Sequence, residues 1–262
     1  MAMNPRLLRP LATFDPDAAA YLRAVEAADG QVLETPVKRA VDDFFKGTKA
    51  DGTFSAIKAA CLLCGARTLA GALVPLVGAA PTNSNFLPGD YNRQTGLVGD
   101  GSTKYLDSNR ANDADPQDDN HNSVFISTVA STLHILGSRN SVSGRNFMDL
   151  GGGGNILRVS ARSNSVLTSS YAPNNGSVIA HSRSASAEMS YRLNGVTYTD
   201  TLASEPPDSD TLLVYARRNV STGAAENFSA NRLAFYSIGE SLDLALLDAH
   251  VSALVAAIGA AL

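Results

Sequence analysis

Tryptophan is absent from this chain of 262 residues, and aromatic residues make up only 6% of it. Charged residues are also scarce, at 18%, so Ser, Thr, Asn and Gly must form much of the surface. Hydrophobic residues reach 44%, which is enough for a packed core and excludes a disordered chain. Without tryptophan, sugar docking would depend on tyrosine faces, and the candidate platforms are Tyr91, Tyr105, Tyr171, Tyr191, Tyr198, Tyr215 and Tyr236.

A basic cluster is also lacking. The net charge is −4 and the arginines are scattered, whereas nucleic-acid binding needs grouped cations that neutralise phosphates. We expect that no apolar run reaches the ~18–20 residues that span a bilayer, since Gly71, Pro75 and Gly78 interrupt residues 69–80. The first ten residues, MAMNPRLLRP, lack the apolar core of a signal peptide. We therefore expect neither nucleic-acid binding nor membrane insertion, and we expect synthesis in a cytoplasm.

Only two cysteines are present, Cys61 and Cys64, in the run CLLC. A C-x-x-C pair can be a redox centre or half of a zinc site. A zinc site needs two further ligands at suitable spacing, and the four histidines are isolated in the sequence. The pattern instead favours both sulfurs packing on one helical face, because buried free cysteine behaves as a small hydrophobe.

Residues 1–66 are predicted to form a helical anchoring segment. Asp15-Pro16 and Thr35-Pro36 are helix starts, in which a capping side chain precedes proline at the first helical position. Thr53 is the expected cap of a third helix, ending at Gly65. The apolar residues that recur at helical spacing in these three helices are Ala18, Tyr21, Leu22, Val25, Ala28, Val37, Ala40, Val41, Phe44, Phe45, Phe54, Ile57, Cys61 and Cys64.

Residues 67–240 are predicted to form an antiparallel β-sandwich. Short runs rich in Val, Ile, Tyr, Phe and Leu alternate there with turn residues, which is typical of sandwiches and barrels. Asn194-Gly195 is the strongest hairpin signal and favours a type I′ turn. The expected strands cover residues 104–106, 123–129, 147–150, 156–161, 177–182, 188–193, 197–199, 212–216 and 232–237.

Residues 241–262 are predicted to form one amphipathic helix, with Ser241 as a candidate cap. Its apolar residues follow at spacings of three and four, as in a heptad seam. Such a seam fits two arrangements, a small oligomeric bundle or a helix docked on its own domain. In the first arrangement the oligomer contacts would be Leu244, Leu247, Val251, Leu254 and Ile258.

Motifs for catalysis and cofactor binding are not evident. Residues 99–104 (GDGSTK) fail the phosphate-loop pattern, because the lysine follows a threonine and opens a strand. The run 151–154 is four glycines without the Rossmann spacing, and we interpret it as a turn between strands. Glycoside hydrolysis needs paired carboxylates, and the two within the expected core strands, Asp149 and Glu188, are distant in sequence. We therefore expect no catalytic residues and no cofactor.

One acidic loop, residues 107–120, is a candidate calcium site. Its carboxylates could supply oxygen ligands, although it lacks the glycine and terminal glutamate of an EF-hand. The alternative is a solvated loop without metal. The acidic residues concerned are Asp107, Asp113, Asp115, Asp118 and Asp119.

Four segments, in the same order along the chain, resemble laminin-G-like and concanavalin A-like jelly-roll domains. They are residues 96–106 with the D-G-S turn, residues 121–129 (HNSVFISTV), residues 189–199 (MSYRLNGVTYT) and residues 231–242 (NRLAFYSIGESL). The helical run 21–31 (YLRAVEAADGQ) and the closing run from Phe235 resemble tailed-bacteriophage virion proteins in which such a sandwich follows a helical segment.

This resemblance implies a non-enzymatic virion component, a tail, fibre or capsid-surface protein. Its partners would be other virion proteins and copies of itself, with a host-surface glycan as a further ligand. The alternatives are a lectin-like receptor-binding module and, third, a glycan-cleaving enzyme. The resemblance carries no catalytic residue to this chain, and laminin-G calcium ligands cannot be matched to its residues.

Overall fold

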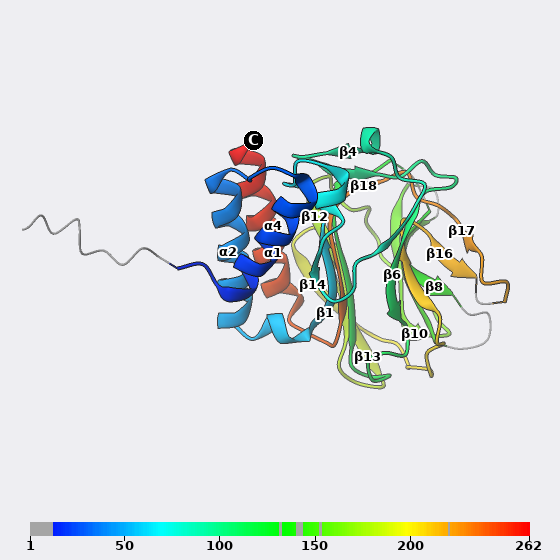
Figure 1. The fold of residues 1–262 in the computed structure, drawn as a ribbon. Helices are drawn as coiled ribbons and strands as arrows, with labels where there is room; N and C mark the ends of the chain where they lie inside the picture. The colour runs from blue at the N-terminus through cyan, green and yellow to red at the C-terminus, as the bar shows by residue number, and fades with distance from the viewer. Residues whose placement is uncertain (1–12, 131–132, 140–143, 152–153, 220) are drawn as a thin grey trace, which may run out of the picture.

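The computed structural model describes residues 13–130, 133–139, 144–151, 154–219 and 221–262. They form a sandwich of two sheets, with helices packed on one side (Figure 1). This confirms the expected class, a mainly antiparallel β-sandwich of the jelly-roll type with N-terminal helices and a C-terminal helix. The helices are α1 (Pro16–Asp29), α2 (Thr35–Ala50), α3 (Leu69–Ala72) and α4 (Leu244–Ala261), with short 3₁₀ turns at Thr53–Ala56 and Pro88–Asp90.

Sheet A has the strand order β14-β13-β12-β7-β18-β1-β2, with β5 paired to β18 and β4 paired to β5. Its strands are β1 (Ile57–Leu62), β2 (Pro75–Val77), β4 (Tyr91–Asn92), β5 (Gly96–Val98), β7 (Asn120–Thr128), β12 (Ser177–Arg183), β13 (Glu188–Leu193), β14 (Val196–Thr201) and β18 (Arg232–Gly239).

Sheet B has the strand order β11-β10-β9-β8-β15-β6-β3, with β16 paired to β8 and β17 paired to β16. Its strands are β3 (Thr82–Ser84), β6 (Tyr105–Ala111), β8 (His134–Arg139), β9 (Arg145–Gly151), β10 (Ile156–Ser163), β11 (Leu167–Thr168), β15 (Thr211–Val214), β16 (Arg217–Asn219) and β17 (Ala225–Glu226).

The hairpin predicted at Asn194-Gly195 is confirmed. Leu193 pairs with Val196 across it, and both turn residues have positive φ, 52° for Asn194 and 79° for Gly195. Positive φ at both central positions is what a type I′ turn requires, and asparagine and glycine tolerate it best. This turn fixes the register of β13 against β14.

The predicted third helix is wrong. After a single 3₁₀ turn, residues 57–62 form strand β1, which lies between β18 and β2 in sheet A. The sandwich therefore begins at residue 57 and not at residue 67. The two cysteines do not share a helical face either, since Cys61 lies between the sheets and Cys64 lies under the helices. Burial raises the pKa of the Cys64 thiol to about 12, so it stays protonated.

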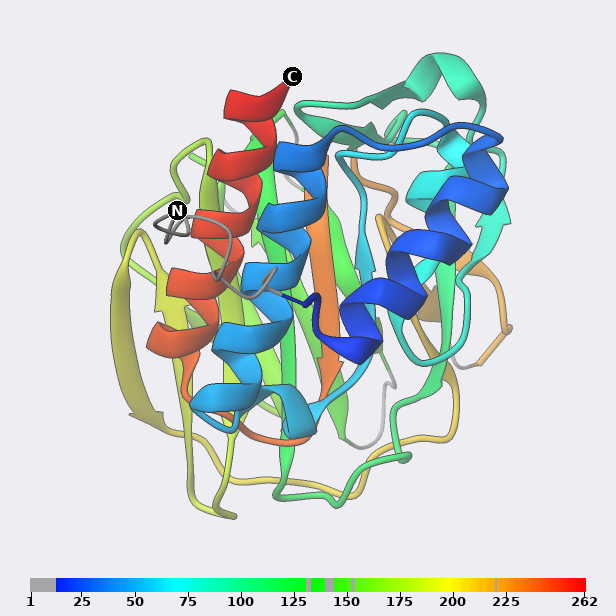
Figure 2. The same cartoon turned by 60° about the vertical axis from the view of Figure 1, so that its left-hand side comes forward.

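Two apolar cores follow from the layers. Between the sheets pack inward residues such as Leu106, Ile126 and Val159, and the opposite side of sheet A packs Phe125 and Phe235 against the helices. We call α1, α2 and α4 the helical layer. Figure 2 shows α2 in the middle of this layer, with α1 on one side and α4 on the other. The layer is thus built from both ends of the chain.

Helix α4 corrects two expectations. Its cap is Asp243 and not Ser241, because the Asp243 carboxylate accepts from the backbone N–H groups of Ala245 and Leu246. The helix also contains an 18-residue window of mean hydropathy 1.8, long and apolar enough to cross a membrane by length and composition alone. The expectation that no apolar run reaches the length of a membrane span is therefore wrong. In the folded protein, 39% of this window is buried, against α2 and sheet A.

Two buried arginines hold the loops at one end of the sandwich. Arg183 is 0% exposed and donates to the backbone carbonyls of Ala161, Ala185, Ser186, Glu188 and Leu202. Arg162 is 1% exposed and donates to the carbonyls of Asn112, Asp115 and Pro116. Burial lowers the pKa of Arg162 to about 10, which still leaves it charged at neutral pH. Each guanidinium is thus surrounded by backbone oxygens from loops and strands outside its own strand.

Replacing Arg183 with methionine should unfold the protein at a lower urea concentration. The apolar side chain leaves carbonyls buried without donors, each costing about 1–3 kcal/mol, so we expect a loss of about 3 kcal/mol or more. The matched control is Arg23→Met on the exposed surface of α1. Equal unfolding midpoints for the two variants would show that the buried guanidinium does not hold these loops.

Candidate functional site

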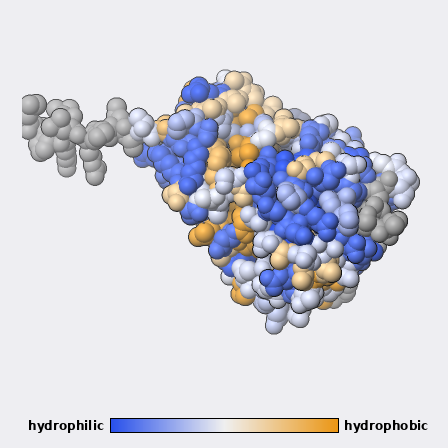
Figure 3. All heavy atoms as spheres, turned by 90° about the horizontal axis from the view of Figure 1, so that it is seen from below, coloured by the Kyte–Doolittle hydropathy of each residue, from blue (hydrophilic) through white to orange (hydrophobic). Residues whose placement is uncertain are grey.

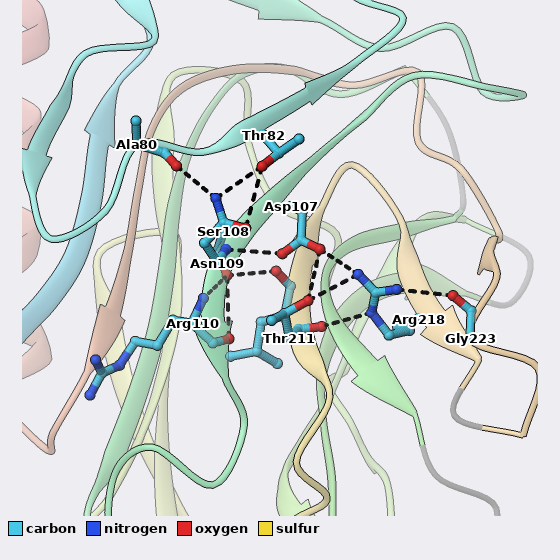
Figure 4. A network of polar contacts seen from close by, with 10 residues as sticks. Ala80, Thr82, Asp107, Ser108, Asn109, Arg110, Thr211, Arg218 and Gly223 are labelled. Carbon is cyan, nitrogen blue, oxygen red and sulfur yellow. Dashed lines mark hydrogen bonds and ion pairs between the residues drawn. The ribbon is translucent and has the colours of Figure 1, made fainter.

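The outer face of sheet B, the side turned away from the helical layer, carries a network of charged and hydroxyl side chains. Alternation along β6 places Leu106 in the core and Asp107 on this outer face. The Asp107 carboxylate accepts from the Thr211 hydroxyl on β15 at 2.8 Å and from the Arg218 guanidinium on β16. Arg218 also donates to the carbonyl of Gly223 at 2.9 Å (Figure 4). The Asp107 carboxylate thereby links β6 to both β15 and β16.

Asn109 extends this network to the edge of the sheet. Its backbone N–H donates to Asp107 at 2.9 Å, and its side-chain amide donates to the carbonyl of Ala80 at 2.8 Å and to the Thr82 hydroxyl at 3.0 Å. Asn109 adopts a positive φ of 56°, which asparagine tolerates better than most residues. The network, shown in Figure 4, is therefore a preorganised polar surface and not a set of loose charges.

A second charged cluster lies on β8, β9 and β10 of the same sheet. Arg158 holds Asp149 through two hydrogen bonds of 2.7 Å each, and the hydrogen-bonded carboxylate raises the pKa of the arginine. The His134 ring lies 3.3 Å from the same carboxylate and packs at a tilt of 47° against Phe147, with ring centroids 4.9 Å apart. The Asp149 carboxylate is only 1% exposed, whereas Arg158 is 40% exposed. The exposed part of this cluster is therefore the planar, positively charged guanidinium of Arg158.

The two carboxylates weighed for glycoside hydrolysis lie in different sheets. Asp149 is on the outer face of sheet B, and Glu188 is exposed at the start of β13 in sheet A. A glycosidase pair flanks one bond at a short, fixed separation. Asp149 and Glu188 therefore do not form such a pair.

The loop proposed for calcium already contains a cation, the guanidinium of Arg162. This side chain takes the carbonyl oxygens of Asn112, Asp115 and Pro116, while Arg110 binds the Asp115 carboxylate. Asp119 accepts from the backbone N–H of Ser241, and Asp107 lies in β6 and not in a loop. Among the described residues, no group of three or more His, Cys, Asp or Glu side chains is placed to hold a metal.

The five residues expected at an oligomer contact lie in the core beneath the helical layer. Leu244, Leu247, Val251, Leu254 and Ile258 are each at most 4% exposed. They pack toward α2 and sheet A, so the docked helix is the arrangement observed. This side of α4 is not available to a second chain.

Buried histidines lie on both sides of sheet A. His121, on the side of the helical layer, contacts the Glu240 carbonyl through Nδ1 and the Ser237 hydroxyl through Nε2. His181, between the sheets, contacts the Asn122 amide, which begins a chain of amide hydrogen bonds through Asn146 to Asn112. Burial lowers the pKa of His121 to about 4 and that of His181 to about 3. Both are therefore neutral in the folded state at ordinary pH.

Sequence patterns did not identify Arg158, Arg162, Arg183 or Arg218 as organising residues. A usable signal existed for Arg183, since Ile179, His181 and Arg183 alternate onto the inward face of β12. A charged residue continuing an inward pattern must be neutralised or fully hydrogen-bonded. The acceptors could not be foreseen, because they are backbone carbonyls of separate loops.

No protein-family model matches the chain, and neither does any curated protein sequence. Several solved structures are similar to it. The binding domain of botulinum neurotoxin serotype D is 13% identical with a TM-score of 0.47, covering 76% of this chain and 51% of that one. Domains LG4-5 of the mouse laminin α1 chain are 13% identical with a TM-score of 0.41, covering 65% and 47%.

A bacteriophage CBA120 tailspike protein domain is also similar, at 10% identity and a TM-score of 0.41, covering 65% of this chain and 29% of that one. This chain thus spans about half or less of each of these three proteins. At these values the likeness assigns neither a family nor an activity.

Stability should decrease as pH falls from about 6.5 toward 4.5. The unfolded histidines take up protons near pH 6.5, while His121 and His181 remain neutral in the folded state, so acid favours unfolding. Replacing His121 with asparagine should lower the slope of unfolding free energy against pH by up to about 1.4 kcal/mol per pH unit. Urea titrations at a series of pH values measure this slope; an unchanged slope would contradict the burial of neutral His121.

Millimolar Ca²⁺ should leave the melting temperature unchanged, and so should its removal with EDTA. Arg162 and Arg110 already bind the carbonyl oxygens of Asn112, Asp115 and Pro116 and the Asp115 carboxylate, which the acidic loop would otherwise offer to calcium. Differential scanning fluorimetry of the wild-type chain, with Mg²⁺ as the matched control, tests this. A rise in melting temperature specific to Ca²⁺ would mean that the loop binds metal in another arrangement.

Proposed function

We propose that this protein is a non-enzymatic structural or recognition module of a bacteriophage particle, attached through its helical layer and exposing the sandwich. The observation that carries the proposal is the difference between the two broad faces of the sandwich. Sheet A is covered by α1, α2 and α4, while sheet B presents the Asp107–Arg218 network and the Arg158 cluster on its outer face. A rigid scaffold with one helical side and one polar side suits a part that joins an assembly and presents a surface.

The view from below shows where hydrophobic residues reach the surface. In Figure 3 they form a band where the helical side meets the sandwich, and hydrophilic atoms cover much of both parts. The resemblance of residues 21–31 and of the closing run from Phe235 to tailed-phage virion proteins supports the particle assignment. The partners would be other virion proteins and copies of this chain, and the location would be the virion.

Binding is favoured over catalysis by the state of the carboxylates on sheet B. Asp107 and Asp149 are each held by an arginine through direct hydrogen bonds. A general acid or base must reach the proton that it transfers, and the oxygens of these two carboxylates are already bound by arginine. We therefore propose that this face serves recognition.

The second candidate function is glycan binding by the outer face of sheet B. Arginine, asparagine and threonine side chains there are fixed by mutual hydrogen bonds, and such preorganised polar groups bind sugar hydroxyls at little entropic cost. Glycan arrays with the wild-type chain and with Arg158→Met would test it. A flat array for both proteins would leave recognition of a protein surface as the role of this face.

An antibody against this chain should label intact particles in electron microscopy. Label at the tail tip or fibres would support receptor recognition, and label spread over the capsid would support a surface role. The control is an antibody preparation adsorbed with the purified chain. Particles that remain unlabelled, while their lysate contains the protein, would refute the virion assignment.

A further inference from the structure

Strand β14 ends sheet A with a free edge. Among the described residues it pairs with β13 on one side and with no strand on the other. Figure 2 shows it in yellow at the margin of the molecule, on the side of α4. Its residues are exposed except for Tyr198, which is half-buried. Because an edge strand carries a row of unpaired backbone N–H and C=O groups, it is a template for another strand.

This edge lacks the features that usually prevent strands from adding to a sheet. Those features are a short edge strand, a lysine, a proline or a bulge. The strands at the other ends of the two sheets are short, since β2 and β3 have three residues each and β11 has two. In contrast, β14 has six residues, contains neither lysine nor proline, and pairs with β13 without a shift of register. Its edge is therefore open to a partner strand.

The hairpin turn determines which backbone groups face this edge. Leu193 and Val196 flank the two-residue turn and form a hydrogen-bonded pair, and such pairs alternate along an antiparallel ladder. The backbone of Tyr198 therefore bonds to β13, whereas the N–H and C=O groups of Thr197 and Thr199 point away from it. Within the part of the chain that the structure describes, these outward groups have no hydrogen-bond partner. They are the groups that a partner strand would bind.

We propose that β14 pairs antiparallel with β14 of a second copy, about a two-fold axis at Tyr198. In this register Thr197 of one copy lies opposite Thr199 of the other, and the reverse. Each outward N–H then faces a carbonyl, so the partial charges of the two edges are complementary along the strand. The inference deepens the structural role proposed above by naming the surface through which copies associate, and it rests on that proposal.

The side chains favour this register over its neighbour. Tyr198 stacks on Tyr191 of β13, with ring centroids 4.9 Å apart and an interplanar angle of 16°. A two-fold axis at Tyr198 places the two Tyr198 rings opposite each other, and aromatic cross-strand pairs stabilise a sheet. The same axis places Asp200 opposite Val196, so the two carboxylates do not meet. An axis at Thr199 would instead set Asp200 against the Tyr198 ring.

The first test compares the full-length chain with Thr199→Pro by sedimentation equilibrium over micromolar concentrations. The wild type should dimerise. Proline removes an outward N–H that β13 does not use, and the two-fold axis removes it from both copies, so the dimer should weaken on the order of 10-fold or more. Thr199→Ala keeps the N–H and is the matched control, which should dimerise like the wild type. Far-ultraviolet circular dichroism and melting temperature confirm folding of each variant.

Cysteine cross-linking tests the register without relying on proline. Residues opposite each other in a non-hydrogen-bonded pair have Cα atoms about 4.5 Å apart, within the range of a disulfide. Tyr198→Cys should therefore give a covalent dimer on mild oxidation, measured by non-reducing gel electrophoresis. Val196→Cys is the matched control and should not cross-link, because its two copies would lie more than ~13 Å apart along the paired strands. The native Cys61 and Cys64 are buried and should not react.

Three results would overturn the inference: a monomeric wild type, a dimer that Thr199→Pro leaves unchanged, or equal cross-linking of the two cysteine variants. A monomer that binds a strand of another virion protein, with binding lost in Thr199→Pro, would overturn it in favour of a different partner. None of these results decides the virion assignment, which the antibody labelling tests separately.

Discussion

Two guanidinium groups that form no ion pair with any carboxylate in the described part of the chain hold one end of this sandwich together. Arg162 and Arg183 are buried and donate to backbone carbonyls of segments that are far apart in the chain. Buried charge is costly unless it is fully hydrogen-bonded, so each loop must keep its place for the arginine to be tolerated. The position of residues 112–116, of residues 185–188 and of Leu202 depends on these two side chains. The polar face of sheet B adjoins these loops through Arg110, which pairs with Asp115.

The sandwich class, the hairpin and the terminal helices could be predicted because their signals are local. Asn194-Gly195 specifies its turn through the φ values that these residues tolerate, and the Asp15-Pro16 cap begins α1 as expected. Strand β1 could not be predicted in the same way. Apart from Lys58 it is buried on both faces, so its sequence is nearly all apolar and lacks the alternation of a half-exposed strand, and periodicity alone does not separate it from a helix.

The candidate site depended on information that periodicity does not contain. The heptad spacing of α4 predicts a buried seam, and this seam is buried. The same spacing fits both an oligomeric bundle and a helix docked on its own domain. Only the positions of α2 and sheet A decide between the two. The pairing of Asp107 with Arg218 joins β6 to β16, and nothing in either segment indicates the other.

The order of the strands has a consequence for how the protein folds. Strand β18, near the end of the chain, lies in sheet A between β7 and β1, and α4 must then pack on α2. Helix α2 therefore lacks its main helical partner until α4, almost 200 residues later in the chain, has been synthesised. Many native contacts join residues that are distant in sequence, which predicts slow folding. Until β18 pairs, part of sheet A has unpaired strand edges, which favour aggregation. Loss of the chain from residue 232 onward would accordingly remove a central strand of sheet A together with α4.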